Sequence, residues 1–578
     1  MSKRIMIWGA GKIGRGFVAE AFDRGGYELV FVDADENLVS RLNEEGRYTL
    51  VKAPPKAEPE VITFEGYSAL HISETEKIDD LVAEVPYIAV VVFPKVFPAL
   101  AKSLAPGIEA RVATGRPLDI IICANARGAA EAFRPHMEAE LTEKGKRYFA
   151  EKVGLAETVI MRVGVSTPER FAAYGDLTVT TSDFPYMPVD KSAFRGDFPE
   201  VPILRPMDGI EAEETRKFYT YNMVHAIYAY AGRMRGHETV TEAAADPLVA
   251  REVDAALEEA ARALDAEYGF GAEEMKEWNR KVVENLTNPL LEDSLERLGK
   301  DPIRKLGYSD RLVGPARLCK FHGVLPYYLS KAIARAFFYE NPDDESAQRL
   351  AALSKEKGMG EALREVASLE RDPELVHMVS EHFTRLVEDP DREEDADRVA
   401  VLRAAYESGY SYEKGYHGCA QCALAALFDA TGEKDPGLFQ ATSAFAGGVG
   451  LTGDGICGGY AAGVLWMGKH VGRRLEYFGG DKEAQYKSFE MTQKLRDRFL
   501  DTYGSITCRH IHESIFGRAY ILRTKAVRDE FEKAGGHDDR CTSVVAMASM
   551  WTTDLLMEEG YIDPKSAAQA GSQHAATE

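Results

Sequence analysis

Three polar side chains interrupt the apolar and aromatic run RKFYTYNMVHA at residues 216–226, namely Lys217, Asn222 and His225. On a helix, Asn222 and His225 are i, i+3 neighbours on one face, and the long stem of Lys217 reaches toward them. Taken singly, each has a structural explanation: a snorkelling lysine, a capping asparagine and a buried histidine. Together they suit alcohol–ketone interconversion, because a desolvated lysine can take the alcohol proton and the other two can donate hydrogen bonds to a developing alkoxide.

A hydride-transfer reaction needs a dinucleotide, and the N-terminal stretch IMIWGAGKIGRGF has the glycine spacing that binds one. The pattern G-x-G-x-x-G follows an apolar run and opens a helix, so the pyrophosphate would face the helix N-terminus. Asp33 ends the next apolar run, about 20 residues on, where a carboxylate bonds the ribose 2′-hydroxyl and favours NAD over NADP. The loop residues expected to contact NAD are Gly9, Ala10, Gly11, Lys12, Ile13 and Gly14. A plain glycine-rich strand–helix turn is the structural alternative.

A parallel sheet would position the glycine loop and Asp33, and the pattern of the first 130 residues predicts such a sheet. Four β-type runs, RIMIWG, ELVFVD, YIAVVVF and LDIIICAN, alternate with helical stretches, which is typical of crossover connections. Strands and loops are expected again over 156–205. The predicted fold class is an α/β Rossmann-type domain over 1–205, followed by a mainly α-helical domain over 206–390.

The acidic run EDPDREEDADR at 388–398 is typical of a solvated linker and marks a domain boundary. Beyond it, residues 399–562 are predicted to form a mainly α-helical, cysteine-containing domain with a glycine-rich middle. The small, polar tail at 563–578 is expected to be disordered.

The cysteines are unevenly distributed, because five of the seven fall in the last third of the chain. Cys419 and Cys422 form C-x2-C at a predicted helix start, where the helix N-terminus is expected to lower the first thiol's pKa. Such thiols can form a disulfide or share a metal, and His510 and His512 are further ligand candidates. The alternative is a set of structural thiols in a buried core. The redox or metal candidates are Cys419, Cys422, Cys457, Cys508 and Cys541.

The overall charge limits the partners. The 578 residues carry a net charge of −23 and a pI near 5.2, which argues against nucleic acid or an anionic membrane surface. The N-terminus does not read as a signal peptide, and no run reaches the roughly 20 apolar residues that span a bilayer. We therefore expect a soluble, cytoplasmic protein whose substrate is a small molecule.

Residues 1–388 resemble the long-chain mannitol dehydrogenase family, specifically the mannitol-1-phosphate 5-dehydrogenases. The likeness rests on GAGKIGRGF, on RKFYTYNMVHAIYAYAG and on NLTNPLLEDSLERLGKDPIRKLGYSDRL. It implies an NAD-dependent, zinc-independent oxidoreductase that interconverts mannitol 1-phosphate and fructose 6-phosphate. By the same likeness, Lys217 is the general base, Asn222 and His225 polarise the carbonyl, and Asn125 in IICANARG lies near the nicotinamide and the substrate.

A phosphorylated substrate requires local cations. Arg304, Lys305 and Arg311 in DPIRKLGYSDRL are the candidates, since guanidinium groups suit phosphate; a charged loop is the structural alternative. Two other functions stay open: reduction of another keto-sugar or a keto-uronate, and NAD(H) binding by a redox sensor or regulator without sugar turnover.

The last third, about 400–562, resembles the small C_GCAxxG_C_C family, which is named for its cysteine pattern. Cys419, Cys457, Cys508 and Cys541 match that pattern, whereas Cys422 is an addition. The resemblance implies a thiol-redox or metal-binding role, with a metal or iron–sulfur cluster as candidate cofactor and a redox protein as candidate partner.

Overall fold

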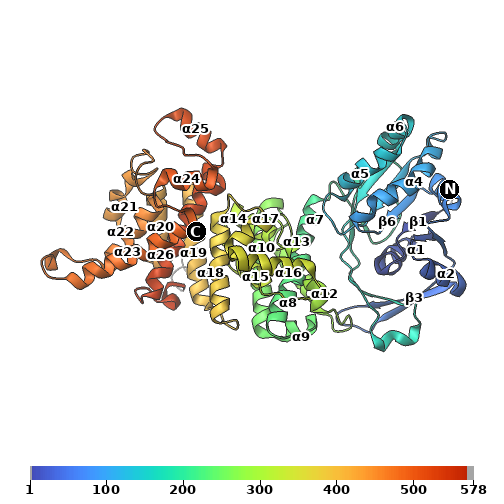
Figure 1. The fold of residues 1–578 in the computed structure, drawn as a ribbon, viewed down its shortest axis with the longest axis horizontal. Coiled ribbons are helices and arrows are strands. Elements are labelled where there is room, and N and C mark those ends of the chain that lie inside the picture. Colours follow the sequence, from blue (N-terminus) through green and yellow to red (C-terminus); the bar gives the residue numbers. More distant parts are fainter. Residues whose placement is uncertain (1–2, 569–578) are drawn as a thin grey trace. The chain divides into compact units, whose positions relative to one another are not determined.

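The computed structural model describes residues 3–568 and divides them into two compact units. Within the described residues, the first unit comprises 3–225, 238–245 and 277–294, and the second comprises 226–237, 246–276 and 295–568. Each unit is described by itself below. The ribbon in Figure 1 is coloured along the chain and labels the elements.

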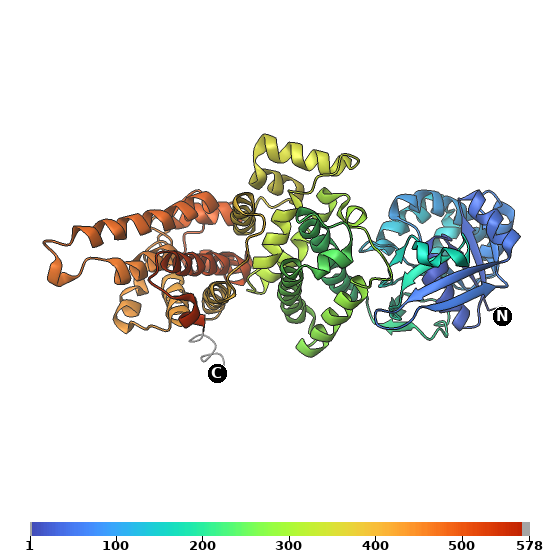
Figure 2. The same cartoon turned by 90° about the horizontal axis from the view of Figure 1, so that it is seen from below.

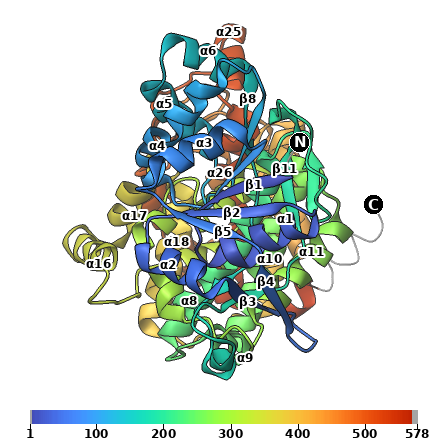
Figure 3. The same cartoon turned by 90° about the vertical axis from the view of Figure 1, so that its right-hand side faces the viewer.

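The first unit is built on a six-stranded parallel sheet with the order β5-β2-β1-β6-β7-β8. Its helices cover both faces (Figure 3). Alternate side chains of β1 therefore enter two hydrophobic clusters, Ile5 and Ile7 on one face, Met6 and Trp8 on the other. The strands are β1 (Arg4–Trp8), β2 (Glu28–Asp33), β5 (Ser68–His71), β6 (Tyr87–Val90), β7 (Leu118–Ile122) and β8 (Val153–Glu157). The helices are α1 (Ala19–Arg24), α2 (Glu36–Glu45), α3 (Thr75–Glu84), α4 (Phe97–Arg111), α5 (Ala129–Glu140) and α6 (Glu143–Lys152).

This sheet confirms the predicted Rossmann-type fold, and the four expected strands correspond to β1, β2, β6 and β7. A second, four-stranded sheet has the order β4-β3-β10-β9, and β11 and β12 form a separate pair. The bounds are β3 (Arg47–Ala53), β4 (Glu60–Glu65), β9 (Gly164–Val165), β10 (Val179–Ser182), β11 (Met187–Asp190) and β12 (Leu204–Met207). Because β10 pairs with β3, residues 156–205 return to this N-terminal fold.

The rest of the described chain is helical, as predicted. The segment that carries Lys217 consists of α7 (Glu211–Lys217), a π-helical turn η5 (Phe218–Asn222) and α8 (Met223–Met234). The following helices are α9 (Val240–Ala245), α10 (Pro247–Tyr268), α11 (Ala272–Leu286), α12 (Leu295–Gly299), α13 (Pro302–Lys305), α14 (Val313–Phe321), α15 (Tyr327–Ala336), α16 (Glu345–Lys357), α17 (Met359–Ala367) and α18 (Pro373–Glu388).

The cysteine-containing part belongs to the second unit, where α19, α20, α22 and α26 pack against one another. The dark red helix of Figure 2 is α26, and the orange segment nearby includes α23. The bounds are α19 (Ala396–Tyr416), α20 (Cys419–Thr431), α21 (Pro436–Ala441), α22 (Gly458–Val471), α23 (Lys482–Tyr503), α24 (Cys508–Phe516), α25 (Lys525–Lys533), the π-helical turn η8 (Gly536–Arg540) and α26 (Cys541–Glu558).

The acidic run before α19 is not solvated throughout. The Glu394 side chain is 8% exposed and lies 3.1 Å from the Lys331 ammonium group, because burial of that lysine requires a counter-charge. The tail at 563–578 was expected to be disordered, but residues 564–568 are helical. Residues 569–578 lie outside the described residues. Across residues 3–568, no helix combines the length and apolar character needed to cross a membrane.

Candidate functional site

The glycine loop between β1 and the following helix has the geometry of a dinucleotide cradle. A Cβ on Gly14 would lie 1.9 Å from Gly9 O, so this glycine permits the close packing of helix and loop. A Cβ on Gly11 would meet no atom within 4 Å, so Gly11 borders open space where a pyrophosphate can approach the backbone. The loop is held by Arg15, which is 8% exposed and donates to Ala10 O at 2.7 Å.

Asp33 lies at the carboxyl end of β2, beside this loop. Its Oδ2 accepts a 2.7 Å hydrogen bond from the backbone N–H of Ala10, and its Oδ1 accepts one of 3.0 Å from Asp35. A carboxylate has about four acceptor positions, so it can still accept a ribose hydroxyl. Lys12 donates to Ser166 Oγ at 3.1 Å, and Ile13 begins the π-helical turn Gly14–Val18. The residues present therefore fit a dinucleotide.

The π-helical turn between α7 and α8 changes which residues share a face. Residues five apart on an α-helix lie about 140° apart, whereas the i→i+5 pattern of a π turn brings them to the same side. Lys217 precedes the turn and Asn222 ends it, so the turn places both residues on the same side of the helix. Thr220 inside the turn accepts a 2.9 Å hydrogen bond from Trp278 Nε1.

Lys217 is 6% exposed, and its ammonium group donates to Asn125 Oδ1 at 2.5 Å. The structure thus brings together two predicted residues that are 92 positions apart. Asn222 is 4% exposed, and its Nδ2 has no hydrogen-bond acceptor among the described residues. The ring of His225 lies 5.3 Å from that of Tyr221, edge to face. A buried donor without an acceptor is costly, so Asn222 has the property expected of a group that receives a substrate oxygen.

Glu214, one helical turn before Lys217, was not predicted as a site residue. It is 8% exposed. Burial and then the charge of Glu157 raise its pKa to about 8, although Arg127 and Lys217 oppose the shift. The sequence signal was weak, because Glu214 stands in an ordinary acidic helix start, EAEE.

The three predicted phosphate ligands lie in the second unit. Lys305 is 4% exposed, and burial, together with the charges of Arg311 and Arg304, lowers its pKa to about 7. Arg311 is 7% exposed and donates to Asp310 Oδ1 at 2.7 Å, whereas Arg304 is half-exposed and pairs with Asp301. The cations therefore influence one another, and an added anion would relieve their repulsion.

Four of the five candidate thiols meet in one cavity of about 340 Å³, lined by Cys419, Cys457, Cys508 and Cys541. His512 Nε2 lies 3.8 Å from Cys508 Sγ and 3.5 Å from Cys541 Sγ. A Cβ on Gly458 would lie 2.3 Å from Cys419 Sγ, so that glycine leaves space for the sulfur. The other predicted histidine, His510, bonds Ser505 and does not line the cavity.

Cys422 does not line the cavity either, and its thiol donates to His417 O at 3.2 Å. The expectation that a helix N-terminus lowers the pKa of Cys419 is wrong. Burial raises the pKa of that thiol well above its ordinary value, followed by the charges of Glu413 and Cys457. Burial likewise raises the pKa of Cys508 to about 12, and it raises the pKa of Cys541 well above its ordinary value. All seven cysteines are free thiols.

The parallel sheet, the glycine cradle and the buried lysine–asparagine pair define an NAD-dependent oxidoreductase. Family comparison agrees: residues 3–202 match the mannitol dehydrogenase Rossmann domain, and residues 210–387 match the mannitol dehydrogenase C-terminal domain. The chain belongs to the mannitol dehydrogenase family. Residues 417–555 match a third model, described as "Putative redox-active protein (C_GCAxxG_C_C)".

Curated relatives cover the same part of the chain. A mannitol-1-phosphate 5-dehydrogenase of Shouchella clausii is 34% identical over 373 residues, which are 64% of this chain and 98% of that protein. One from Brevibacillus brevis is 32% identical over 382 residues, 66% of this chain and 97% of that protein. The fold is shared with Pseudomonas fluorescens mannitol 2-dehydrogenase, solved with NAD and D-mannitol (15% identity, TM-score 0.57, 67% of this chain and 92% of that one). It is also shared with a D-sorbitol dehydrogenase (14% identity, TM-score 0.57, 67% and 93%).

Proposed function

We propose that this protein interconverts D-mannitol 1-phosphate and D-fructose 6-phosphate with NAD. The observation that carries the proposal is the buried Lys217, held by Asn125 in the same unit as the glycine cradle. Both curated relatives described above are named for this substrate. Reduction of another keto-sugar or a keto-uronate would use the same residues, and NADH oxidation with fructose 6-phosphate, run beside fructose and the keto-uronates, distinguishes these reactions.

NAD held by the glycine cradle and Asp33 would supply the hydride acceptor and donor chemistry. Lys217 takes the proton of the alcohol during oxidation and returns it during reduction, and its hydrogen bond to Asn125 orients the ammonium group. The unsatisfied Nδ2 of Asn222 donates to the substrate oxygen, and His225 provides a second donor. Donors that are already oriented stabilise the negative charge that develops on that oxygen.

We assign substrate phosphate to the cations of the second unit, Arg304, Lys305 and Arg311. Lys305 is the most informative of the three to substitute. A phosphate dianion would favour the charged form of this lysine, whereas its surroundings otherwise disfavour that form. The test compares oxidation of mannitol 1-phosphate with that of mannitol.

We expect Lys305→Met to raise KM for mannitol 1-phosphate about tenfold or more, the equivalent of a charge-assisted hydrogen bond of roughly 1.5–3 kcal/mol, and to leave mannitol oxidation unchanged. The matched control is Lys300→Met, which removes an exposed lysine that pairs with Glu296. Equal effects on both substrates would contradict the assignment.

We infer further that the four cavity thiols bind a transition metal or an iron–sulfur cluster, and that this domain exchanges electrons with a redox partner. Metal binding releases the protons of the cysteine thiols, and the cation then compensates the charge of the thiolates; four cysteines are the common ligand set of such clusters. Metal and sulfide analysis of full-length protein purified without air tests this inference. Disulfides without metal or sulfide would contradict it.

A further inference from the structure

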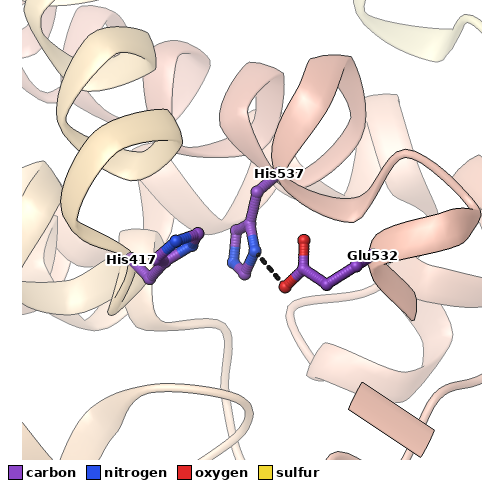
Figure 4. Close-up of side chains that lie close together, drawn as sticks. All are labelled: His417, Glu532 and His537. Atoms are coloured by element: carbon purple, nitrogen blue, oxygen red, sulfur yellow. Dashed lines mark hydrogen bonds and ion pairs between the residues drawn. The ribbon is translucent and has the colours of Figure 1, made fainter. Parts of the chain in front are cut away.

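A second group of ligand-type side chains lines the same cavity and contains no cysteine. His417 follows α19, Glu532 lies in the last turn of α25, and His537 lies in the π-helical turn η8. One ligand atom from each lies within 4.8 Å of the others. Figure 4 shows these side chains converging from separate elements.

The geometry of this group suits a small cation. His537 Nδ1 and Glu532 Oε1 are 2.7 Å apart, and the rings of His417 and His537 lie 3.9 Å apart at 65°. Metal–nitrogen and metal–oxygen bonds of about 2.0–2.2 Å place tetrahedral ligand atoms roughly 3.3–3.6 Å apart, so His537 Nδ1 and Glu532 Oε1 would separate by less than about 1 Å around an ion. His417 and Glu532 are exposed, so their side chains can rotate around an ion without disturbing the core.

A buried carboxylate provides an independent indication of a ligand. Glu413 is 3% exposed, and its Oε1 lies 3.6 Å from Nε2 of His537, the nitrogen that faces away from Glu532. Its Oε2 is buried and accepts no hydrogen bond from the described residues. Carboxylates in this position behind a metal-bound imidazole fix the tautomer and orient the ring.

The backbone is strained at His417, which caps the C-terminus of α19 by donating its N–H to Glu413 O at 3.3 Å. Its φ of 60° and ψ of 165° fall in a region that is almost restricted to glycine, at a cost of about 1–3 kcal/mol. The Cys422 thiol donates to the carbonyl oxygen of this residue at 3.2 Å and so helps to hold the conformation. An ordinary ion pair between His537 and Glu532 would need neither His417 nor this strain.

We propose that His417, His537 and Glu532 bind one divalent transition-metal ion of the Zn²⁺, Co²⁺ and Fe²⁺ class, at a site separate from the four thiols. Two imidazoles and one carboxylate suit these borderline cations rather than Ca²⁺ or Mg²⁺. Three protein ligands leave at least one coordination position for water or a small ligand in the cavity. This proposal is independent of the sugar chemistry in the first unit.

Co²⁺ titration of the reduced full-length protein under argon tests the proposal, because Co²⁺ reports its ligands by absorption. We expect visible bands of a nitrogen and oxygen site that persist in Cys457→Ser. His417→Ala and Glu532→Gln should weaken this binding more than 100-fold, and Glu413→Gln should weaken it by about 10–100-fold, the usual effect of an outer-shell partner. His510→Ala removes a histidine of the same domain outside the group and is the matched control.

Two outcomes would overturn the proposal. One is Co²⁺ binding that shows only thiolate charge-transfer absorption, disappears in Cys457→Ser and is unchanged in His417→Ala and Glu532→Gln. The other is the absence of any Co²⁺ binding by protein that has native circular dichroism. Since His417 and Glu532 are exposed, their variants should fold normally, and the comparison does not depend on replacing a buried residue.

Discussion

Alanine substitutions at Gly11 and Gly14 in the cofactor loop should have different effects, one on NADH binding and the other on stability. In Gly11→Ala the new Cβ meets no protein atom within 4 Å, so stability should change by no more than about 0.5 kcal/mol. The same methyl would occupy the space where the pyrophosphate must approach the backbone. We therefore expect the Kd for NADH to rise about tenfold or more, equivalent to about 1.4 kcal/mol.

Gly14→Ala should have the opposite pattern. Its Cβ would lie 1.9 Å from Gly9 O, and relieving that overlap costs about 1–3 kcal/mol or more, so the melting temperature should fall. Thermal unfolding of the protein without cofactor and fluorescence titration with NADH measure the two effects separately. Wild-type NADH affinity in a folded Gly11→Ala variant would refute the placement of the dinucleotide.

Two further predictions concern a buried carboxyl group and a thiol that lines the cavity. The pKa of Glu214, near 8 in the folded protein, lies above its ordinary 4.5, so folding takes up a proton between these values and stability falls as pH rises through that window. Glu214→Gln should therefore gain stability relative to wild type by a few kcal/mol between pH 5 and pH 8 in denaturant titrations, and an equal difference at both pH values would argue against the raised pKa. Gly458→Ala places a methyl 2.3 Å from Cys419 Sγ and should lower the metal content of the thiol site. Gly468→Ala in the same helix, which meets nothing within 4 Å, should retain the metal content of wild type.

The predicted cofactor residues depend on local signals. The G-x-G-x-x-G spacing and Asp33 belong to one strand–loop–helix–strand unit, in which the backbone N–H of Ala10 donates to Asp33 Oδ2. The run around Lys217 was predicted as a regular helix, and the π-helical turn at 218–222 was not foreseen. That turn depends on tertiary contacts, among them the hydrogen bond from Trp278 to Thr220, which the helical periodicity does not reveal.

The cysteine domain was predicted less completely for a similar reason. The spacing of C-x2-C suggested that Cys419 and Cys422 act together, but a hydrogen bond directs Cys422 to His417 O instead. The helix N-terminus suggested a lowered pKa, and burial outweighed it. His417 and His537 are 120 residues apart and belong to no spacing motif, so only the packing of α19 with η8 and α26 could bring them together.

The most direct test of the central claim is NADH oxidation with fructose 6-phosphate by wild type and by Lys217→Met, with NADH affinity measured on the same samples. We expect turnover by wild type, a loss of about 10²–10⁴-fold in the rate of Lys217→Met, and unchanged NADH affinity in that variant. Lys102→Met, which removes an exposed lysine of the same unit, should have the wild-type rate. Tight NADH binding without turnover by wild type, or full activity of Lys217→Met, would contradict the claim.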